Sequence, residues 1–225
     1  LGRLLVEGGV ALIICNTIAR AQEVYGALNI TYPGEVELHH AGFMAWQRSE
    51  KEDRMRQELG PDSHRGEGRP WRKIVVATQV AEQSLDIDAD VLVTDLAPMD
   101  LIIQRIGRLH RHGRPESDRP EQLRKPQVFI RAIESLEPAP TIDSGANAVY
   151  DPLILLKTLL QLPTEFKRPD DVATLVQSTY SDDHVVPEEW EEVWAEASSQ
   201  SEQRIDRAHQ RSGSFRIDSP LDAHR

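Results

Sequence analysis

The chain has 225 residues, 39% of them hydrophobic and 28% charged, so it can bury a core and is not a disordered polymer. Its formal net charge of −11 argues against a general polyanion binder, because that charge repels nucleic acid. The single cysteine, Cys15, excludes a disulfide within the chain, and no apolar stretch is long enough to span a membrane. We therefore expect a cytoplasmic protein without a membrane partner and, since the first residue is Leu1 rather than Met, a piece of a longer protein.

Strands and helices are expected to alternate through residues 1–132. Short apolar runs predict buried strands at residues 10–15, 36–39, 74–77, 91–94 and 127–130. Between them the pattern predicts helices that begin after Asn16 or Thr17, at Trp46 and at Asp100, and a polar surface loop over residues 60–72. This alternation is typical of an α/β fold in which helices cover both faces of a parallel sheet.

The composition changes after residue 132. Residues 133–150 are rich in Pro, Ser, Ala and Gly and are interpreted as a connector. Residues 151–225 are expected to form an all-helical C-terminal extension, with helices over 151–162, 170–180 and 187–211. We interpret the acidic run of the last helix as a solvated face, and the extension shows no residue pattern that points to chemistry.

One segment places polar groups directly after a strand. In VVATQVAEQSLDID, residues 75–88, Thr78 and Gln79 follow the strand and Asp86 lies near the end of the loop. Ligands of open parallel sheets bind beyond the carboxyl ends of the strands, so these groups are candidates for nucleic-acid or ribose contacts. Taken alone, the segment is better explained as a polar loop capped by aspartates than as a binding site.

The second segment is IIQRIGRLHRHGR, residues 102–114. Arg108 and Arg111 are three residues apart, so on a helix they share a face, one turn after Gln104. Paired guanidinium groups suit a phosphate, although a basic surface helix explains the same spacing. Between Arg105 and Lys125, seven basic residues stand against three acidic ones, which predicts a local cationic patch on an acidic body.

Together the two segments resemble the signature motifs of the second RecA-like domain of superfamily 2 helicases. The first motif is matched by Ala77, Thr78, Leu85 and Asp86, and the second by Gln104, Arg105, Gly107, Arg108 and Arg111. CNTIARA, residues 15–21, and LHHAGF, residues 38–43, occupy two further motif positions. EQSLDID, DLAPMDLIIQRIGRLHRH and YDPLILLKTL are similar to the CRISPR-associated helicase-nuclease of type I interference systems, over roughly residues 8–200. That family often has arginine where this chain has Gly42.

The resemblance implies a RecA-like sheet and roles for individual residues. Arg108 and Arg111 would act as arginine fingers on the γ-phosphate of ATP held by a neighbouring domain, and Gln104 would orient them. We expect this pair at the ligand edge of the sheet, beside Asp86. The residues assigned to the nucleotide site are Asp86, Arg105 and Gly107, of which the glycine would permit close approach of the helix. The residues assigned to the backbone of single-stranded DNA are Asn16, Thr17, His40, Thr78 and Gln79.

Several motifs of a complete enzyme are not found in the 225 residues. The chain has no G-x-x-x-x-G-K-[ST] phosphate loop, no Asp-Glu dipeptide for magnesium and no His-Asp dipeptide of the kind a two-metal nuclease uses. By the resemblance, ATP and Mg²⁺ would be bound mainly by a first RecA-like domain, and a nuclease domain would belong to the same protein. Single-stranded DNA and an RNA-guided multisubunit surveillance complex are the other expected partners.

The expected function is that of the C-terminal helicase domain of an ATP-dependent DNA helicase-nuclease in antiviral CRISPR interference, inactive alone. Two alternatives stay open. The chain is also compatible with a non-catalytic DNA- or partner-binding α/β module, and with the helicase domain of a superfamily 2 enzyme outside CRISPR systems. No metal site is predicted, because His110 and His112 have no companion carboxylate or cysteine at ligand spacing.

Overall fold

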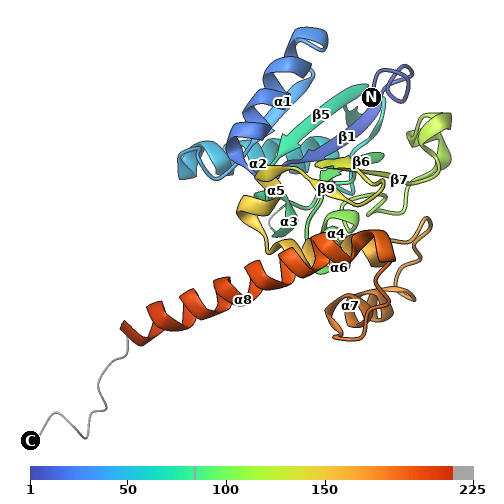
Figure 1. Ribbon diagram of the computed structural model, residues 1–225. Coiled ribbons are helices and arrows are strands. Elements are labelled where there is room, and N and C mark those ends of the chain that lie inside the picture. The colour runs from blue at the N-terminus through green and yellow to red at the C-terminus, as the bar shows by residue number, and fades with distance from the viewer. Residues whose placement is uncertain (84, 215–225) are drawn as a thin grey trace, which may run out of the picture.

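Five parallel strands form the central sheet, and helices lie against it on both sides (Figure 1). The computed structural model describes residues 1–83 and 85–214. The strand order is β2-β5-β1-β6-β7, and every neighbouring pair is parallel. The strands are β1 (Gly9–Ile14), β2 (Val36–His39), β5 (Arg72–Ala77), β6 (Val91–Asp95) and β7 (Gln127–Arg131). All five predicted strands are confirmed, with β5 beginning two residues earlier than expected.

The central strand β1 is buried along its whole length, because both faces of the sheet are covered. Leu12 packs in one core with Met55 of α2, while Ile13 packs in a second core with Ala21 of α1. Burying one such leucine or isoleucine side chain stabilises the fold by about 1.5–3 kcal/mol. The helices of this part are α1 (Ile18–Thr31), α2 (Ala45–Leu59), α3 (Val80–Gln83) and α4 (Met99–Ile106). The helices expected to begin near Thr17, Trp46 and Asp100 are confirmed.

The segment 60–72 lies largely at the surface, as its composition predicts, but it is more ordered than a polar loop. It forms a two-stranded ladder of β3 (His64–Arg65) and β4 (Gly68–Arg69), and its last residue already belongs to β5. The Arg69 side chain is buried against Asp90. Composition alone misleads here because the partner carboxylate lies 21 residues farther along the chain.

The connector, residues 133–150, is folded against the sheet. It contains β8 (Ile133–Ser135), β9 (Thr141–Ile142) and α5 (Ser144–Val149), and β8 pairs antiparallel with β9. Ala146 of α5 is buried together with Leu96, which follows β6, and Leu155 of the next helix. The connector therefore joins the sheet and the extension through a shared apolar core.

The extension is helical, as predicted. It comprises α6 (Pro152–Gln161), α7 (Val172–Tyr180) and the long α8 (Glu191–Ser214), which runs away from the sheet toward the C-terminus (Figure 1). Short 3-10 helices lie at Glu116–Asp118, Glu121–Leu123 and Glu188–Trp190. Residues 215–225 of the predicted extension lie outside the described residues. In the part of the chain that the structure describes, no helix combines the length and apolarity needed to cross a bilayer.

Candidate functional site

The carboxyl edge of the sheet gathers the residues that were assigned to DNA. Asn16 and Thr17 follow β1, Thr78 and Gln79 follow β5, and His40 follows β2. Because β2, β5 and β1 are adjacent and parallel, their carboxyl ends meet at one edge of the sheet. Sequence reasoning thus identified a set of residues that the fold brings together.

The side chains at this edge differ in how accessible they are. Asn16 is buried, and its amide donates to the carbonyl oxygen of Leu96 at 2.7 Å. Thr78 is buried too, whereas Thr17 and Gln79 are partly exposed. The Thr17 hydroxyl caps α1 by accepting a hydrogen bond from the Arg20 backbone N–H. Thr17 and Gln79 are therefore accessible to a ligand, whereas the buried Asn16 holds the backbone at this edge through its hydrogen bond to Leu96.

His40 lies in a tight turn. Its Nδ1 accepts a hydrogen bond from the Gly42 backbone N–H at 3.1 Å, and its ring stacks on Phe43 with a centroid separation of 4.4 Å. Burial lowers the pKa of His40, so the ring is neutral near pH 7. A Cβ atom on residue 42 would lie 3.0 Å from His40 Nδ1, so a side chain at this position would displace the ring. The glycine at this position therefore fits the local packing.

Arg105 does not lie in an open nucleotide site, and its assignment as a nucleotide ligand is corrected. Its side chain has 0% exposure and donates to Glu82 at 2.8 Å, to the Thr94 hydroxyl at 2.8 Å and to the Asp95 carbonyl at 2.9 Å. It also donates to Asn16 Oδ1 at 3.3 Å and to the Tyr150 hydroxyl at 3.1 Å. A buried guanidinium needs hydrogen-bond acceptors for its N–H groups, and these five acceptors all belong to the protein itself.

Arg111 is the more accessible of the two candidate fingers. Its Nε donates to Asp86 Oδ1 at 2.6 Å, and the two side chains are 39% and 45% exposed. The hydrogen bond from Arg111 lowers the pKa of Asp86, which keeps the carboxylate charged. An arginine held by one carboxylate at the surface still presents N–H groups to a phosphate.

Arg108 is half-buried and occupied by backbone carbonyls. Its Nη1 donates to the Leu85 carbonyl and its Nη2 to the Glu82 carbonyl, both at 2.6 Å. Burial lowers the pKa of Arg108, and its Nε has no hydrogen-bond partner among the described residues. In this conformation Arg108 fixes the loop after α3, and the N–H groups that these two carbonyls do not use remain for a further partner.

The finger pair lies beside Asp86, as expected, but not at the carboxyl edge of the sheet. Leu109 forms a β-bridge with Ala89, two residues before β6 begins, so the segment after α4 passes the amino end of that strand. The reason is the direction of α4, which starts after the carboxyl end of β6 and returns along the sheet. The expected position of the pair is therefore corrected.

Gln104 and Gly107 flank the buried arginine. Gln104 is exposed near the end of α4, and Gly107 is the C-cap of that helix with an ordinary φ of −58°. A Cβ atom on Gly107 would lie 2.9 Å from the Gln104 carbonyl oxygen, so the glycine permits a tight helix end. That role differs from the expected approach of the helix to a nucleotide.

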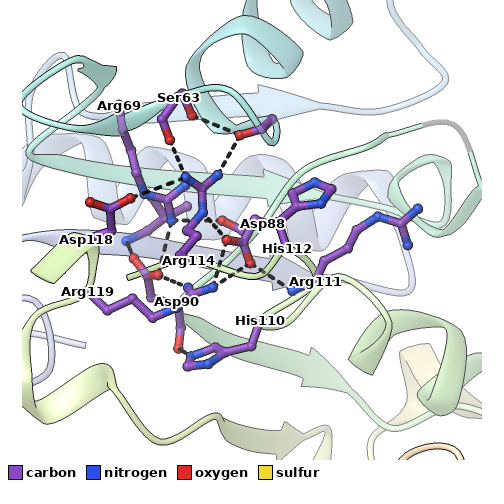
Figure 2. Close-up of polar contacts among 12 residues, drawn as sticks. Ser63, Arg69, Asp88, Asp90, His110, Arg111, His112, Arg114, Asp118 and Arg119 are labelled. Atoms are coloured by element: carbon purple, nitrogen blue, oxygen red, sulfur yellow. Dashed lines mark hydrogen bonds and ion pairs between the residues drawn. The ribbon is translucent and has the colours of Figure 1, made fainter. Parts of the chain in front are cut away.

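Two of the seven basic residues of the predicted cationic patch, Arg114 and Arg119, belong to an internal ion-pair cluster, shown in Figure 2. Arg119 donates to Asp88 at 2.8 and 3.0 Å and also pairs with Asp90, while Arg114 pairs with Asp88. Arg69 donates to Asp90 at 3.1 Å. All five side chains are buried. Charges removed from water in this way require paired partners, and the two carboxylates provide them.

The buried cluster also holds the backbone of the candidate finger. Asp88 Oδ1 accepts a hydrogen bond from the Arg111 backbone N–H at 2.8 Å. Asp86, two residues earlier in the chain, contacts the Arg111 side chain. Asp90 Oδ2 accepts from the Val10 backbone N–H at 2.8 Å, at the start of β1. Sequence reasoning missed this cluster, although aspartates at 86, 88 and 90 alternate directly before a strand. Within residues 1–83 and 85–214, no group of three or more His, Cys, Asp or Glu side chains could hold a metal ion.

The parallel sheet and the two motif segments define the class of protein, which is the second RecA-like domain of a superfamily 2 helicase. A family model described as "CRISPR-associated nuclease/helicase Cas3, C-terminal" matches residues 7–114. The chain belongs to this Cas3 family and corresponds to the C-terminal part of its helicase.

Relatives and solved structures agree with this assignment. The CRISPR-associated nuclease/helicase Cas3 of Streptococcus thermophilus is 36% identical over 222 residues, which are 96% of this chain and 23% of that protein. A crystal structure of a CRISPR-associated protein superposes with a TM-score of 0.84 at 37% identity, covering 94% of this chain and 24% of that one. The chain therefore spans about a quarter of the length of these proteins.

Two further structures show the family in defined states. The crystal structure titled T. fusca Cas3-ATP superposes with a TM-score of 0.75 at 34% identity, over 93% of this chain and 24% of that chain. A chain of a structure titled CRISPR RNA-guided surveillance complex, pre-nicking, superposes with a TM-score of 0.74 at 32% identity, over 98% of this chain and 26% of that chain.

Proposed function

We propose that the chain is the C-terminal helicase domain of an ATP-dependent, single-stranded-DNA translocase that also carries a nuclease domain and acts in CRISPR interference. ATP and Mg²⁺ would be bound mainly by a first RecA-like domain of the same protein, and this domain would be inactive alone. The T. fusca Cas3-ATP and surveillance-complex structures support a nucleotide and an RNA-guided complex as partners of this kind of protein. The family match disfavours a helicase outside CRISPR systems.

The observation that carries the proposal is the Arg111–Asp86 pair. Arg111 is fixed at both ends, its backbone N–H by Asp88 and its Nε by Asp86, yet 39% of its side chain remains exposed. A pre-positioned, accessible guanidinium is what an arginine finger requires, because it stabilises transition-state charge without reorganising. We propose Arg111 as the principal finger and Arg108, whose two Nη groups each already donate to a backbone carbonyl, as a second arginine.

We further propose that the carboxyl edge contacts the backbone of the DNA strand. Thr17 and Gln79 are partly exposed there. The Thr17 hydroxyl would donate to a phosphate oxygen, and Gln79 would do so by releasing its 3.4 Å hydrogen bond to the Tyr150 hydroxyl, while Asn16, Thr78 and His40 hold the backbone that frames them. Contacts of this type are independent of base sequence and weaken as salt concentration rises.

The test uses the complete protein that contains this chain. Arg111→Ala should reduce DNA-stimulated ATP hydrolysis by about 10³-fold or more, with ATP binding changed much less, because a finger acts on the transition state. Arg124→Ala is the matched control, since Arg124 is similarly exposed and pairs at the surface with Glu116, at 3.9 Å. If Arg111→Ala kept wild-type hydrolysis, the finger role would be wrong, and a wild-type protein without any ATPase activity would favour the non-catalytic module.

A further inference from the structure

Four residues from four different segments form a closed ring of hydrogen bonds, called here the Arg105 ring. Arg105 of α4 donates to the Tyr150 hydroxyl at 3.1 Å and to Asn16 Oδ1 at 3.3 Å. Gln79, which follows β5, donates to the same Tyr150 hydroxyl at 3.4 Å and to the Asn16 carbonyl at 2.9 Å. The ring therefore joins the ends of β1 and β5 to the arginine motif of α4.

Tyr150 is the one member of the ring that lies outside residues 1–132. It is the C-cap of α5, at the junction of the connector with α6. Its carbonyl accepts a hydrogen bond from Arg204 of α8 at 2.7 Å, and the same arginine donates to the Asn147 carbonyl at 2.7 Å. The Tyr150 side chain packs against the apolar core that contains Leu96 and Leu155. The position of Tyr150 is thus set by the helical extension.

The buried Arg105 guanidinium depends on the Tyr150 hydroxyl as a hydrogen-bond acceptor. Arg105 is fully buried, and among the described residues its Nη2 group donates to Asn16 and Tyr150. Removal of the hydroxyl leaves a buried, charged N–H without its acceptor, which costs more than the loss of a neutral hydrogen bond. The guanidinium then has to shift, and Asn16 and Gln79 shift with it.

We propose that Tyr150 is a positioning residue that couples the helical extension to the two motif segments, so that the placement of the extension controls how strongly DNA stimulates ATP hydrolysis. This inference rests on the proposed function, because the ring joins residues beside the proposed DNA edge to the arginine helix. The coupling needs no movement of the sheet, since the hydroxyl contacts both sides of the ring directly.

The experiment compares Tyr150→Phe with Tyr180→Phe in the complete protein. Tyr180 of α7 is the matched control because its hydroxyl also ties the extension to α4, but through Asp100, at 2.6 Å, which is not a member of the Arg105 ring. We expect Tyr150→Phe to lower the ratio of DNA-stimulated to basal ATPase about 3- to 30-fold, the range that single contacts in coupled networks produce. The Tyr180→Phe variant should keep the wild-type ratio. Thermal unfolding of both variants shows whether stability explains a difference.

Each outcome has a distinct meaning. A loss of DNA stimulation in Tyr150→Phe alone, with similar unfolding temperatures for the two variants, supports the coupling role. Equal effects of the two substitutions overturn it, because any contact between the extension and α4 would then affect DNA stimulation in the same way. No effect of either substitution also overturns it, because the Tyr150 hydroxyl would then not influence DNA stimulation. Absence of DNA-stimulated ATPase in the wild-type protein instead overturns the proposed function itself. Failure of the coupling inference and failure of the proposed function are therefore distinguishable.

Discussion

Replacing Asp88 with asparagine should destabilise the chain more than any surface charge substitution. Asp88 is fully buried and accepts hydrogen bonds from Arg114, from Arg119 and from the Arg111 backbone N–H. Burial by itself would raise the pKa of Asp88, but Arg119 and Arg114 outweigh it and hold the pKa below its usual range. The substitution Asp88→Asn keeps the size of the side chain and removes the charge.

The size of the effect follows from the charges left behind. In the wild-type cluster Arg69, Arg114 and Arg119 stand against Asp88, Asp90 and Asp118. With Asp88 neutral, three buried guanidinium groups share two carboxylates, and the amide N–H₂ group faces donors. Removing one partner of a buried ion pair costs about 3–5 kcal/mol, a large part of the roughly 5–15 kcal/mol that stabilises a domain. For a chain of this length the melting temperature should fall by about 6–20 °C.

The assay is thermal and urea unfolding followed by circular dichroism. Asp53→Asn is the control, because Asp53 is 60% exposed and its pair with Arg56 should contribute less than about 1 kcal/mol. The difference between wild type and Asp88→Asn should stay constant from neutral pH down to about pH 4 and shrink below it. The reason is that a carboxylate with a lowered folded pKa stabilises the fold above its unfolded pKa and loses this effect as it protonates. A destabilisation below about 1 kcal/mol at pH 7 would refute the ion-pair argument.

Two smaller predictions concern buried groups of the sheet. Burial lowers the pKa of His39, so the folded ring is neutral, whereas the unfolded ring titrates near about 6.5 and binds a proton below that pH. The wild-type free energy of unfolding should therefore fall more steeply than that of His39→Gln between pH 7 and pH 5.5 in urea titrations, and parallel slopes would contradict the assignment. Burial raises the pKa of Cys15 to about 12, so a thiol reagent at pH 8 should label the chain only after denaturant is added. Rapid labelling of the native chain would show that β1 is open to solvent.

The sequence predicted the strands and helices well because their signals are local. A short apolar run such as residues 10–15 can be buried only where both faces of a sheet are covered, so strand β1 and its parallel neighbours followed from the pattern. The motif spacing likewise placed Asp86 near Arg111, and the structure joins them at 2.6 Å. The roles assigned to these residues remain proposals.

Whether each arginine is buried or exposed was decided by the tertiary structure alone. Arg105, Arg114 and Arg111 look equivalent in a basic run, yet the first two are buried and the third is half exposed. What separates them is whether a carboxylate from a distant segment meets the side chain inside the fold, and here Glu82 and Asp88 lie 23 and 26 residues away along the chain. Hydrophobic periodicity depends on residues that are close together in the sequence, so it can be detected before the fold is known. The partner of a buried charge can come from a distant segment, so it is known only from the folded structure.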